Sequence, residues 1–187
     1  MRFLAPIVAA GAWVLLAATA EAGLVYVGEY GGRPYCYQST LRPYAQARDE
    51  AVSLGGHLVC INNDAENAWL ASSLAPLTPT LARVAWIGLA NHGQGWQWES
   101  GEAVNYTNWR PAGVGPGWAE PTGDDAGCMY LADTQYSPPI PLGLWGDTYS
   151  TDGWPSIYEG VAPEPATLSL LALGGLVLLR RRRGASS

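Results

Sequence analysis

The feature that most constrains the fold of this chain is a series of aromatic and acidic motifs between residues 86 and 147. Each motif is short, and it is their fixed order that carries the information. In chain order the motifs are Trp86-Ile87-Gly88-Leu89, Trp96-Gln97-Trp98-Glu99-Ser100-Gly101, Asn105-Tyr106-Thr107-Asn108-Trp109, Glu120-Pro121-Thr122, Cys128-Met129-Tyr130-Leu131 and Trp145-Gly146-Asp147.

The residues before this series predict the order strand, helix, strand, helix. Residues 26–37 have the pattern of strands around a glycine turn. Residues 44–54 place apolar side chains at helical spacing, and two glycines follow as a stop signal. Residues 58–61 form a short apolar strand. Asn63 is followed three residues later by a glutamate, a variant of the capping box that begins a second helix, which two prolines then end.

In this order the motifs resemble the C-type lectin-like domain, over residues 35–159. The resemblance implies an α+β fold, with two helices packed on small antiparallel sheets and a long irregular loop that displays the ligand-binding residues. Residues 110–127 match this loop, with five glycines and three prolines. A loop of this length inside a compact domain is usually functional or disordered. Function is favoured, because predicted strands hold both of its ends.

The resemblance also implies a set of site residues. Sugar-binding members hold calcium with a Glu-Pro-Asn triplet, a later acid and a Trp-Asn-Asp triplet, whose ligands also bond sugar hydroxyls. Here both asparagines are replaced, by Thr122 and Gly146. Carboxylates are the main calcium ligands, so a calcium ion would be held by Glu120, Asp125 and Asp147. The predicted ligand-binding residues are Trp118, Glu120, Thr122, Asp124, Asp125, Trp145 and Asp147.

The alternative is that these acids form a solvated loop edge, and that Pro121, in the cis form, shapes the turn. Asp125 is preferred to Asp124 as a metal ligand only because it lies nearer to Cys128.

Aromatic residues are concentrated between residues 23 and 160. This segment holds eight of the nine tryptophans and all ten tyrosines, but no phenylalanine. Aromatic rings with a polar group suit half-buried positions and sugar faces. They equally suit a β-rich core. We expect Trp86, Trp98 and Trp109 in the core, because they lie in strand-like patterns, and Trp118 at the surface of the loop.

The three cysteines, Cys36, Cys60 and Cys128, are an odd number for an exported protein. Against the lectin-like pattern, Ala51 and Tyr158 stand where one disulfide is expected, and Ser150 replaces the partner of Cys128. Whether Cys36 and Cys60 meet stays open, and a buried free thiol at Cys60 is the more ordinary interpretation.

The charge and the residue types exclude several functions. Residues 23–160 hold five arginines and fourteen acids, a net charge of −9. This argues against nucleic acid or an anionic membrane surface as the partner. His57 and His92 have neither the spacing of a zinc motif nor a nucleophile partner. Loop carboxylates without rigid support do not make a glycosidase pair, so we expect no enzyme.

Both ends of the chain predict export. Residues 1–22 have the positive start, apolar stretch and small residues of a secretory signal peptide, with a retained membrane helix as the alternative. At the other end, an apolar run of fourteen residues follows a Pro-Glu-Pro triplet and precedes an arginine block. As a helix this run is about 21 Å long, against a hydrocarbon core of about 30 Å. The motif residues are Pro163, Glu164, Pro165, Arg180, Arg181, Arg182 and Arg183.

Residues 161–187 resemble the PEP-CTERM sorting signal of Gram-negative bacteria. The resemblance implies transient inner-membrane anchoring, removal by an exosortase-type enzyme and release to the cell surface or extracellular matrix. An ordinary single-pass anchor is the alternative. The arginine block should stay cytoplasmic, which puts the domain at residues 23–160 outside. The sequence thus predicts an exported module that binds carbohydrate, or else a protein-binding or structural matrix component on the same fold.

Overall fold

The computed structural model describes residues 23–80, 83–116, 118–131 and 137–162 of the 187-residue chain. The predicted signal peptide lies outside these residues, as do the Pro-Glu-Pro and arginine motifs of the sorting signal. None of the helices within the described ranges is long and apolar enough to cross a membrane.

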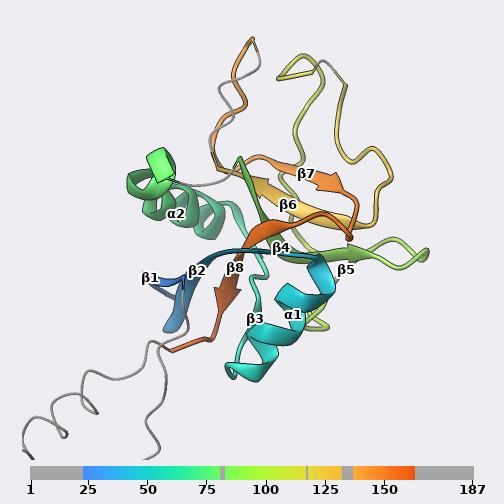
Figure 1. The fold of residues 1–187 in the computed structure, drawn as a ribbon. Helices are drawn as coiled ribbons and strands as arrows, with labels where there is room; N and C mark the ends of the chain where they lie inside the picture. Colours follow the sequence, from blue (N-terminus) through green and yellow to red (C-terminus); the bar gives the residue numbers. More distant parts are fainter. Residues whose placement is uncertain (1–22, 81–82, 117, 132–136, 163–187) are drawn as a thin grey trace, which may run out of the picture.

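A sheet forms the centre of the domain (Figure 1). In the described residues its strand order is β1-β2-β8-β4-β6-β7, with β3 beside β8 and β5 beside β4. Neighbouring strands are antiparallel, except that β4 meets β8 in parallel at Trp86 and Ser156. The strands are β1 (Leu24–Tyr30), β2 (Arg33–Arg42), β3 (His57–Leu58), β4 (Val84–Asn91), β5 (Trp96–Trp98), β6 (Ala126–Tyr130), β7 (Trp145–Thr148) and β8 (Trp154–Glu159).

Two helices pack against this sheet, as predicted. Helix α1 (Tyr44–Ser53) lies against β3, β4 and β8, and α2 (Asp64–Leu74) lies against β1. The side chain of Asn63 caps α2 by accepting a hydrogen bond of 2.9 Å from the backbone N–H of Glu66. The two prolines expected to end α2 lie in a 3₁₀ helix, Ala75–Thr80, that continues directly from it.

Tryptophan side chains fill the core where the strand pattern predicted them. Trp86 and Trp98 are buried, and Trp109 is partly buried against the same core cluster as Trp98. The indole Nε1 of Trp86 donates a hydrogen bond of 2.8 Å to the carbonyl oxygen of Arg42 at the end of β2. Burial of such a large ring with its polar group bonded stabilises the sheet and links β4 to the end of β2.

The three cysteines are all free and buried. Ala51 and Tyr158 lie in one buried cluster, so side-chain packing occupies the place of the first expected disulfide. The hydroxyl of Tyr158 also donates a hydrogen bond of 2.6 Å to Glu50 on α1. Near the second expected disulfide, the Cys128 thiol donates to the carbonyl oxygen of Gly146, at 3.4 Å. Packing and hydrogen bonds therefore act near the positions where the lectin-like pattern has disulfides.

Candidate ligand-binding site

The long loop, predicted at residues 110–127, ends at residue 125 in the structure because β6 begins at Ala126. The loop lies with β6 and β7 in the upper part of the domain (Figure 1). Its first residue is fixed to β7, because the backbone N–H of Arg110 donates to the carbonyl oxygen of Trp145 at 2.8 Å. Its last residue is fixed to β4, because the carbonyl oxygen of Asp125 accepts from Asn91 at 3.0 Å. The strands thus hold both ends of the loop, as predicted.

The interior of the long loop is occupied by the side chain of Arg110, which is fully buried. Its Nη1 donates to the carbonyl oxygens of Val114 at 2.5 Å and Trp118 at 2.7 Å. Its Nη2 forms an ion pair of 2.6 Å with Oε1 of Glu120. The guanidinium also lies over the ring of Tyr130, 5.9 Å from the ring centroid. The guanidinium of Arg110 therefore contacts three residues of the loop and Tyr130 of strand β6.

Glu120 is the predicted site residue that pairs with this cation, and 5% of its side chain is exposed. The pKa of Glu120 is raised to about 7, mainly by burial and next by the hydrogen bond with Asp147, although Arg110 acts to lower it. Burial also tends to raise the pKa of Asp147, but hydrogen bonds from Glu120 and from backbone N–H groups outweigh it and leave the pKa lowered. The structure thus brings Glu120 and Asp147 together as a coupled pair beside Arg110.

The carboxylate of Asp147, at the end of β7, organises the turn after Pro121. Oδ1 accepts hydrogen bonds from the backbone N–H of Thr122 at 2.8 Å and from its hydroxyl at 3.1 Å. Oδ2 accepts from the backbone N–H groups of Gly123 at 2.8 Å and Asp124 at 2.7 Å. The Glu120–Pro121 peptide bond is cis, as expected. Asp147 acts here as a structural acceptor for three consecutive backbone N–H groups.

Asp125, the third expected metal ligand, faces a different partner. Its Oδ1 accepts from the backbone N–H of Ser150 at 2.6 Å, and its Oδ2 accepts from the Ser150 hydroxyl at 2.7 Å. Calcium needs six to eight oxygens directed at one point. Glu120 is paired with Arg110, Asp147 is occupied by N–H donors, and Asp125 is turned to Ser150. These residues do not fit a calcium ion, and the expected set of three carboxylates is not assembled.

The outer face of the loop carries the exposed residues of the predicted set. Trp118 is 56% exposed, and Thr122 and Asp125 are also exposed, while Asp124 is half-buried. Trp145 corrects the prediction: its side chain is fully buried in the core and cannot contact a ligand. Its Nε1 donates a hydrogen bond of 2.9 Å to Asn67 on α2 instead.

Sequence reasoning placed Arg110 only at the start of the loop and missed its role. The signal available was an arginine directly after a core tryptophan, Trp109, in a segment whose other charged residues are all acidic. Such a residue needs a counter-charge if it is buried. The acids of the loop were the nearest candidates in the sequence.

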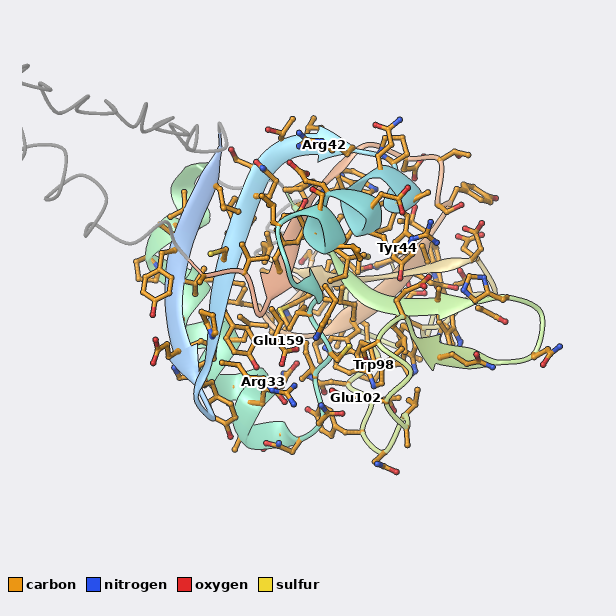
Figure 2. The ribbon with its side chains drawn as sticks, turned by 90° about the horizontal axis from the view of Figure 1, so that it is seen from below. Arg33, Arg42, Tyr44, Trp98, Glu102 and Glu159 are labelled. Atoms are coloured by element: carbon orange, nitrogen blue, oxygen red, sulfur yellow. The ribbon has the colours of Figure 1, made fainter. Side chains whose placement is uncertain are left out.

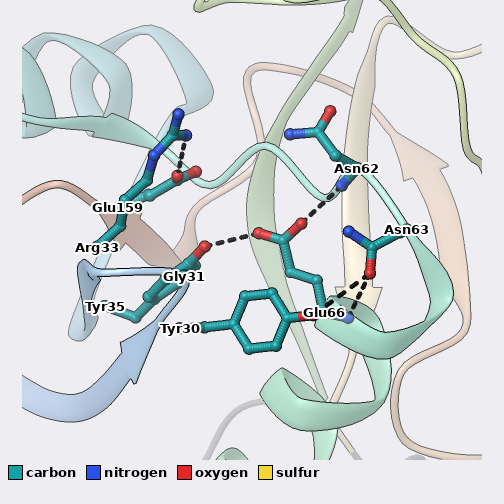
Figure 3. Close-up of a pocket in the computed structure, with 8 residues that line it drawn as sticks. All are labelled: Tyr30, Gly31, Arg33, Tyr35, Asn62, Asn63, Glu66 and Glu159. Atoms are coloured by element: carbon teal, nitrogen blue, oxygen red, sulfur yellow. Dashed lines mark hydrogen bonds and ion pairs between the residues drawn. The ribbon is translucent and has the colours of Figure 1, made fainter.

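A second polar site lies away from the loop, between the β1–β2 turn and the start of α2. It is a hollow of about 230 Å³ (Figure 3). Its polar groups largely bond one another: the Tyr35 hydroxyl donates to Glu66 at 2.6 Å, and Arg33 pairs with Glu159 at 2.6 Å. Figure 2 shows Arg33 beside Glu159 and Glu102, and Arg33 also pairs with Glu102 at 3.3 Å. These contacts join the ends of distant segments and serve the fold.

Next to this hollow, His57, Cys60 and Glu159 place their ligand atoms within 4.8 Å of one another. Glu159 is already bonded to Arg33 and to the backbone N–H of Cys60, at 3.1 Å. The Cys60 thiol donates to Ser100 at 3.1 Å, and Nδ1 of His57 lies 2.8 Å from the carbonyl oxygen of Leu58. The three side chains are therefore satisfied by protein partners.

Two family models match the sequence. The model described as the lectin C-type domain matches residues 40–149, and the PEP-CTERM protein-sorting motif matches residues 161–183. The second match implies export and a surface or extracellular location.

Curated relatives match over parts of their length. The chain is 31% identical to mouse asialoglycoprotein receptor 1 over 85 residues, which is 44% of this chain and 28% of the receptor. It is 39% identical to mouse regenerating islet-derived protein 3-beta over 62 residues, 29% of this chain and 35% of that protein. With rat C-type mannose receptor 2 the identity is 32% over 89 residues, 45% of this chain and 6% of the receptor. The chain thus spans about a third or less of these relatives.

Solved structures share the fold. Human lithostathine superposes with a TM-score of 0.59 at 20% identity, over 75% of this chain and 98% of lithostathine. A calcium-independent type II antifreeze protein gives 0.54 at 21% identity, over 77% and 95% of the two chains. The carbohydrate-recognition domain of cow CD23, solved in the presence of a GlcNAc2Man3 oligosaccharide, gives 0.53 at 20%, over 77% and 97%. Because the lectin model covers more than half of its residues, this chain belongs to the C-type lectin domain family, whose members are binding modules rather than enzymes.

Proposed function

We propose that this protein is an exported recognition module that binds a carbohydrate on the outer face of its long loop. The observation that carries the proposal is the exposure of Trp118, at 56%, in the middle of a loop that Arg110 holds from inside. The exposed indole is therefore free of core packing and available to contact a ligand. An indole ring offers a flat apolar face and one N–H donor, which suit the face and hydroxyl groups of a sugar ring.

The relatives support this ligand class. Asialoglycoprotein receptor 1 and C-type mannose receptor 2 are named for glycan ligands, and the cow CD23 domain was solved with an oligosaccharide present. The net charge of −9 over residues 23–160 disfavours anionic polymers as ligands. A neutral sugar, such as one in the exopolysaccharide of the cell that exports the protein, fits both the charge and the exposed indole.

The sugar contacts in this proposal come from side chains at the loop surface. Trp118 supplies the stacking face, and the half-buried carboxylate of Asp124 borders the same loop, whereas both oxygens of Asp125 already accept hydrogen bonds from Ser150. Carboxylates accept hydrogen bonds from sugar hydroxyls with charge assistance. Both oxygens of Asp147 are engaged within the fold, so Asp147 supports the loop rather than the ligand.

A protein-binding or structural role in the extracellular matrix is the second candidate. The observation that favours it is that the residues aligned with the sugar-bonding triplets, Thr122 and Asp147, bond each other at 3.1 Å. A surface whose polar groups are already satisfied suits an apolar protein contact through Trp118 and the exposed Tyr149.

Export is the other part of the proposal. The sorting motif at residues 161–183 serves as a transient inner-membrane anchor that an exosortase-type enzyme removes, and the domain is released to the cell surface or matrix.

A glycan array with the full chain tests the ligand class. Trp118→Ala should abolish glycan binding, whereas Tyr26→Ala should not, because Tyr26 is 45% exposed on β1, away from the loop. Circular dichroism of both variants confirms folding. If the wild type binds no glycan and instead retains a matrix protein in a manner that needs Trp118, the second candidate replaces the first.

A further inference from the structure

We infer that the guanidinium group of Arg110 is the built-in cation of the ligand-binding loop, and that it makes the loop independent of calcium. In this family fold a metal ion is the expected partner of the loop acids. Here the protein supplies the positive charge from its own chain, and a fully buried side chain holds that charge in place.

The side chain of Arg110 is surrounded by oxygen atoms of the loop. Its two terminal nitrogens contact two backbone carbonyl oxygens, from Val114 and Trp118, and one carboxylate oxygen, from Glu120, at 2.5–2.7 Å. Backbone carbonyls and carboxylates are also the oxygens that calcium takes as ligands. The loop therefore arranges an oxygen cluster around a cation, but the cation is planar and donates directed hydrogen bonds.

The charges of the Glu120–Asp147 pair are already balanced by protein groups. Arg110 offsets one of the two carboxylates of the Glu120–Asp147 pair, and three backbone N–H donors satisfy the other. A divalent ion added here would have to remove these donors from Asp147 and displace the guanidinium from Glu120. It would then leave a buried arginine without a counter-charge, which is strongly unfavourable.

The main chain of Arg110 is also anchored by hydrogen bonds. Its backbone N–H bonds the carbonyl oxygen of Trp145, and its own carbonyl oxygen accepts from the backbone N–H of Glu120, both at 2.8 Å. The side chain and main chain of one residue thus close the loop on itself, with β7 as the support. Arg110 is a positioning residue: it holds the segment that presents Trp118 and does not itself face the ligand.

The consequence deepens the proposed function. If the loop binds a glycan, the binding proceeds without a metal bridge between the protein and the sugar hydroxyls, and chelators leave it unchanged. The insensitivity of glycan binding to chelators rests on the proposed function, but the stability of the loop with and without calcium does not. The two can be tested separately.

Thermal unfolding of the full chain in 5 mM calcium chloride and in 5 mM EDTA tests the inference, with isothermal titration of calcium alone as a second readout. The wild type should show the same Tm in both buffers and no binding heat. Arg110→Ala exposes the oxygens of Glu120, Val114 and Trp118, so its Tm should be lower in EDTA. Calcium should then raise it by about 3–5 °C, as expected for a millimolar site. The added substitution Glu120→Gln should cancel this rise.

A calcium-dependent rise in the Tm of the wild type, or measurable heat of calcium binding, would overturn the inference whether or not the variant folds. A folded Arg110→Ala variant with no calcium response would overturn it as well, since Arg110 would then only fill space. Arg110→Lys is the matched control: it keeps the charge and should remain indifferent to calcium. If all calcium responses are as expected but the wild type binds no glycan, only the proposed function is contradicted.

Discussion

The indole rings of Trp98 and Trp145 meet edge to face, with centroids 5.7 Å apart and planes at 75°. The contact joins β5 to β7, the strand that supports the long loop. Tyr106 and Trp109 also pack edge-on against Trp145, at 5.6 and 5.9 Å. The long loop is therefore supported by a cluster of aromatic rings.

Trp98→Ala should destabilise the domain by about 3–5 kcal/mol, the usual range for truncating a buried aromatic side chain. Trp98 is 2% exposed, whereas Trp118 is 56% exposed. Trp118→Ala should therefore change stability by less than about 0.5 kcal/mol. Urea unfolding of both variants measures the two changes in unfolding free energy. Equal losses would show that Trp118 is a packed structural residue and that the proposed binding face is misplaced.

Asp147→Asn should loosen the turn that follows Pro121. The substitution keeps the size of the side chain, but an amide cannot accept from Thr122, Gly123 and Asp124 with both of its terminal atoms. We expect a loss of about 2–3 kcal/mol, because hydrogen bonds to a charged acceptor are lost. Hydrogen exchange should rise at residues 122–124 in particular. Unchanged exchange at these amides would contradict the assigned role of Asp147.

Glu120→Gln should remove a component of the pH dependence of stability. The pKa of Glu120 is about 7 in the folded chain and about 4.3 in an unfolded one. Between these values the folded state holds a proton that the unfolded state has released. This contribution to wild-type stability therefore falls as the pH rises from about 4.5 to 7, and is level above that.

Urea unfolding of the wild type and of the Glu120→Gln variant at pH 5, 6, 7 and 8 isolates this contribution, since all other titrating groups are common to both proteins. The difference in unfolding free energy should shift in favour of the variant as the pH rises. Parallel curves would show that Glu120 has no raised pKa.

The stability of the domain should not depend on a disulfide bond among the three cysteines. Burial raises the pKa of Cys36 to about 11 and that of Cys60 to about 12, and it also raises the pKa of Cys128. Buried thiols with raised pKa values react slowly. The Tm should therefore be the same with and without dithiothreitol, and iodoacetamide at pH 8 should label the protein only after unfolding. A reductant-sensitive Tm would reveal a disulfide.

The mature protein should lack the arginine tail. The sorting motif at residues 161–183 predicts removal before release from the membrane. Mass spectrometry of the protein from the surface and matrix fractions of its native host should find a C-terminus upstream of Arg180. Intact Arg180–Arg183 in those fractions would rule out processing and favour the permanent single-pass anchor.

Much of the fold could be predicted because the strands and helices have local patterns. Alternating tryptophans marked β5, and Asn63 with Glu66 marked the start of α2, since capping depends on residues three positions apart. The number of thiols was visible as well. The buried free thiol expected at Cys60 is confirmed, but whether Cys36 and Cys60 meet could not be predicted, because pairing depends on which segments meet in space.

The candidate site could be predicted only in outline. The position of the loop followed from motif order, and Trp118 was correctly placed at its surface. The contacts of the acids could not be read, because each one has a partner whose presence depends on the folded loop. Asp125 bonds Ser150, which is 25 residues away in the sequence, and Trp145 was assigned to the ligand although its neighbours bury it.

The separation of the long loop from strand β8 has a consequence for how the protein is displayed. The described chain leaves the sheet after β8, in the lower part of the domain in Figure 1, while the loop lies in the upper part. A molecule held by its C-terminal end would point the loop outward, away from the bilayer. If the proposed glycan binding and anchoring hold, a molecule that is still anchored could bind a polymer before cleavage, and several anchored copies could bind one polymer chain together.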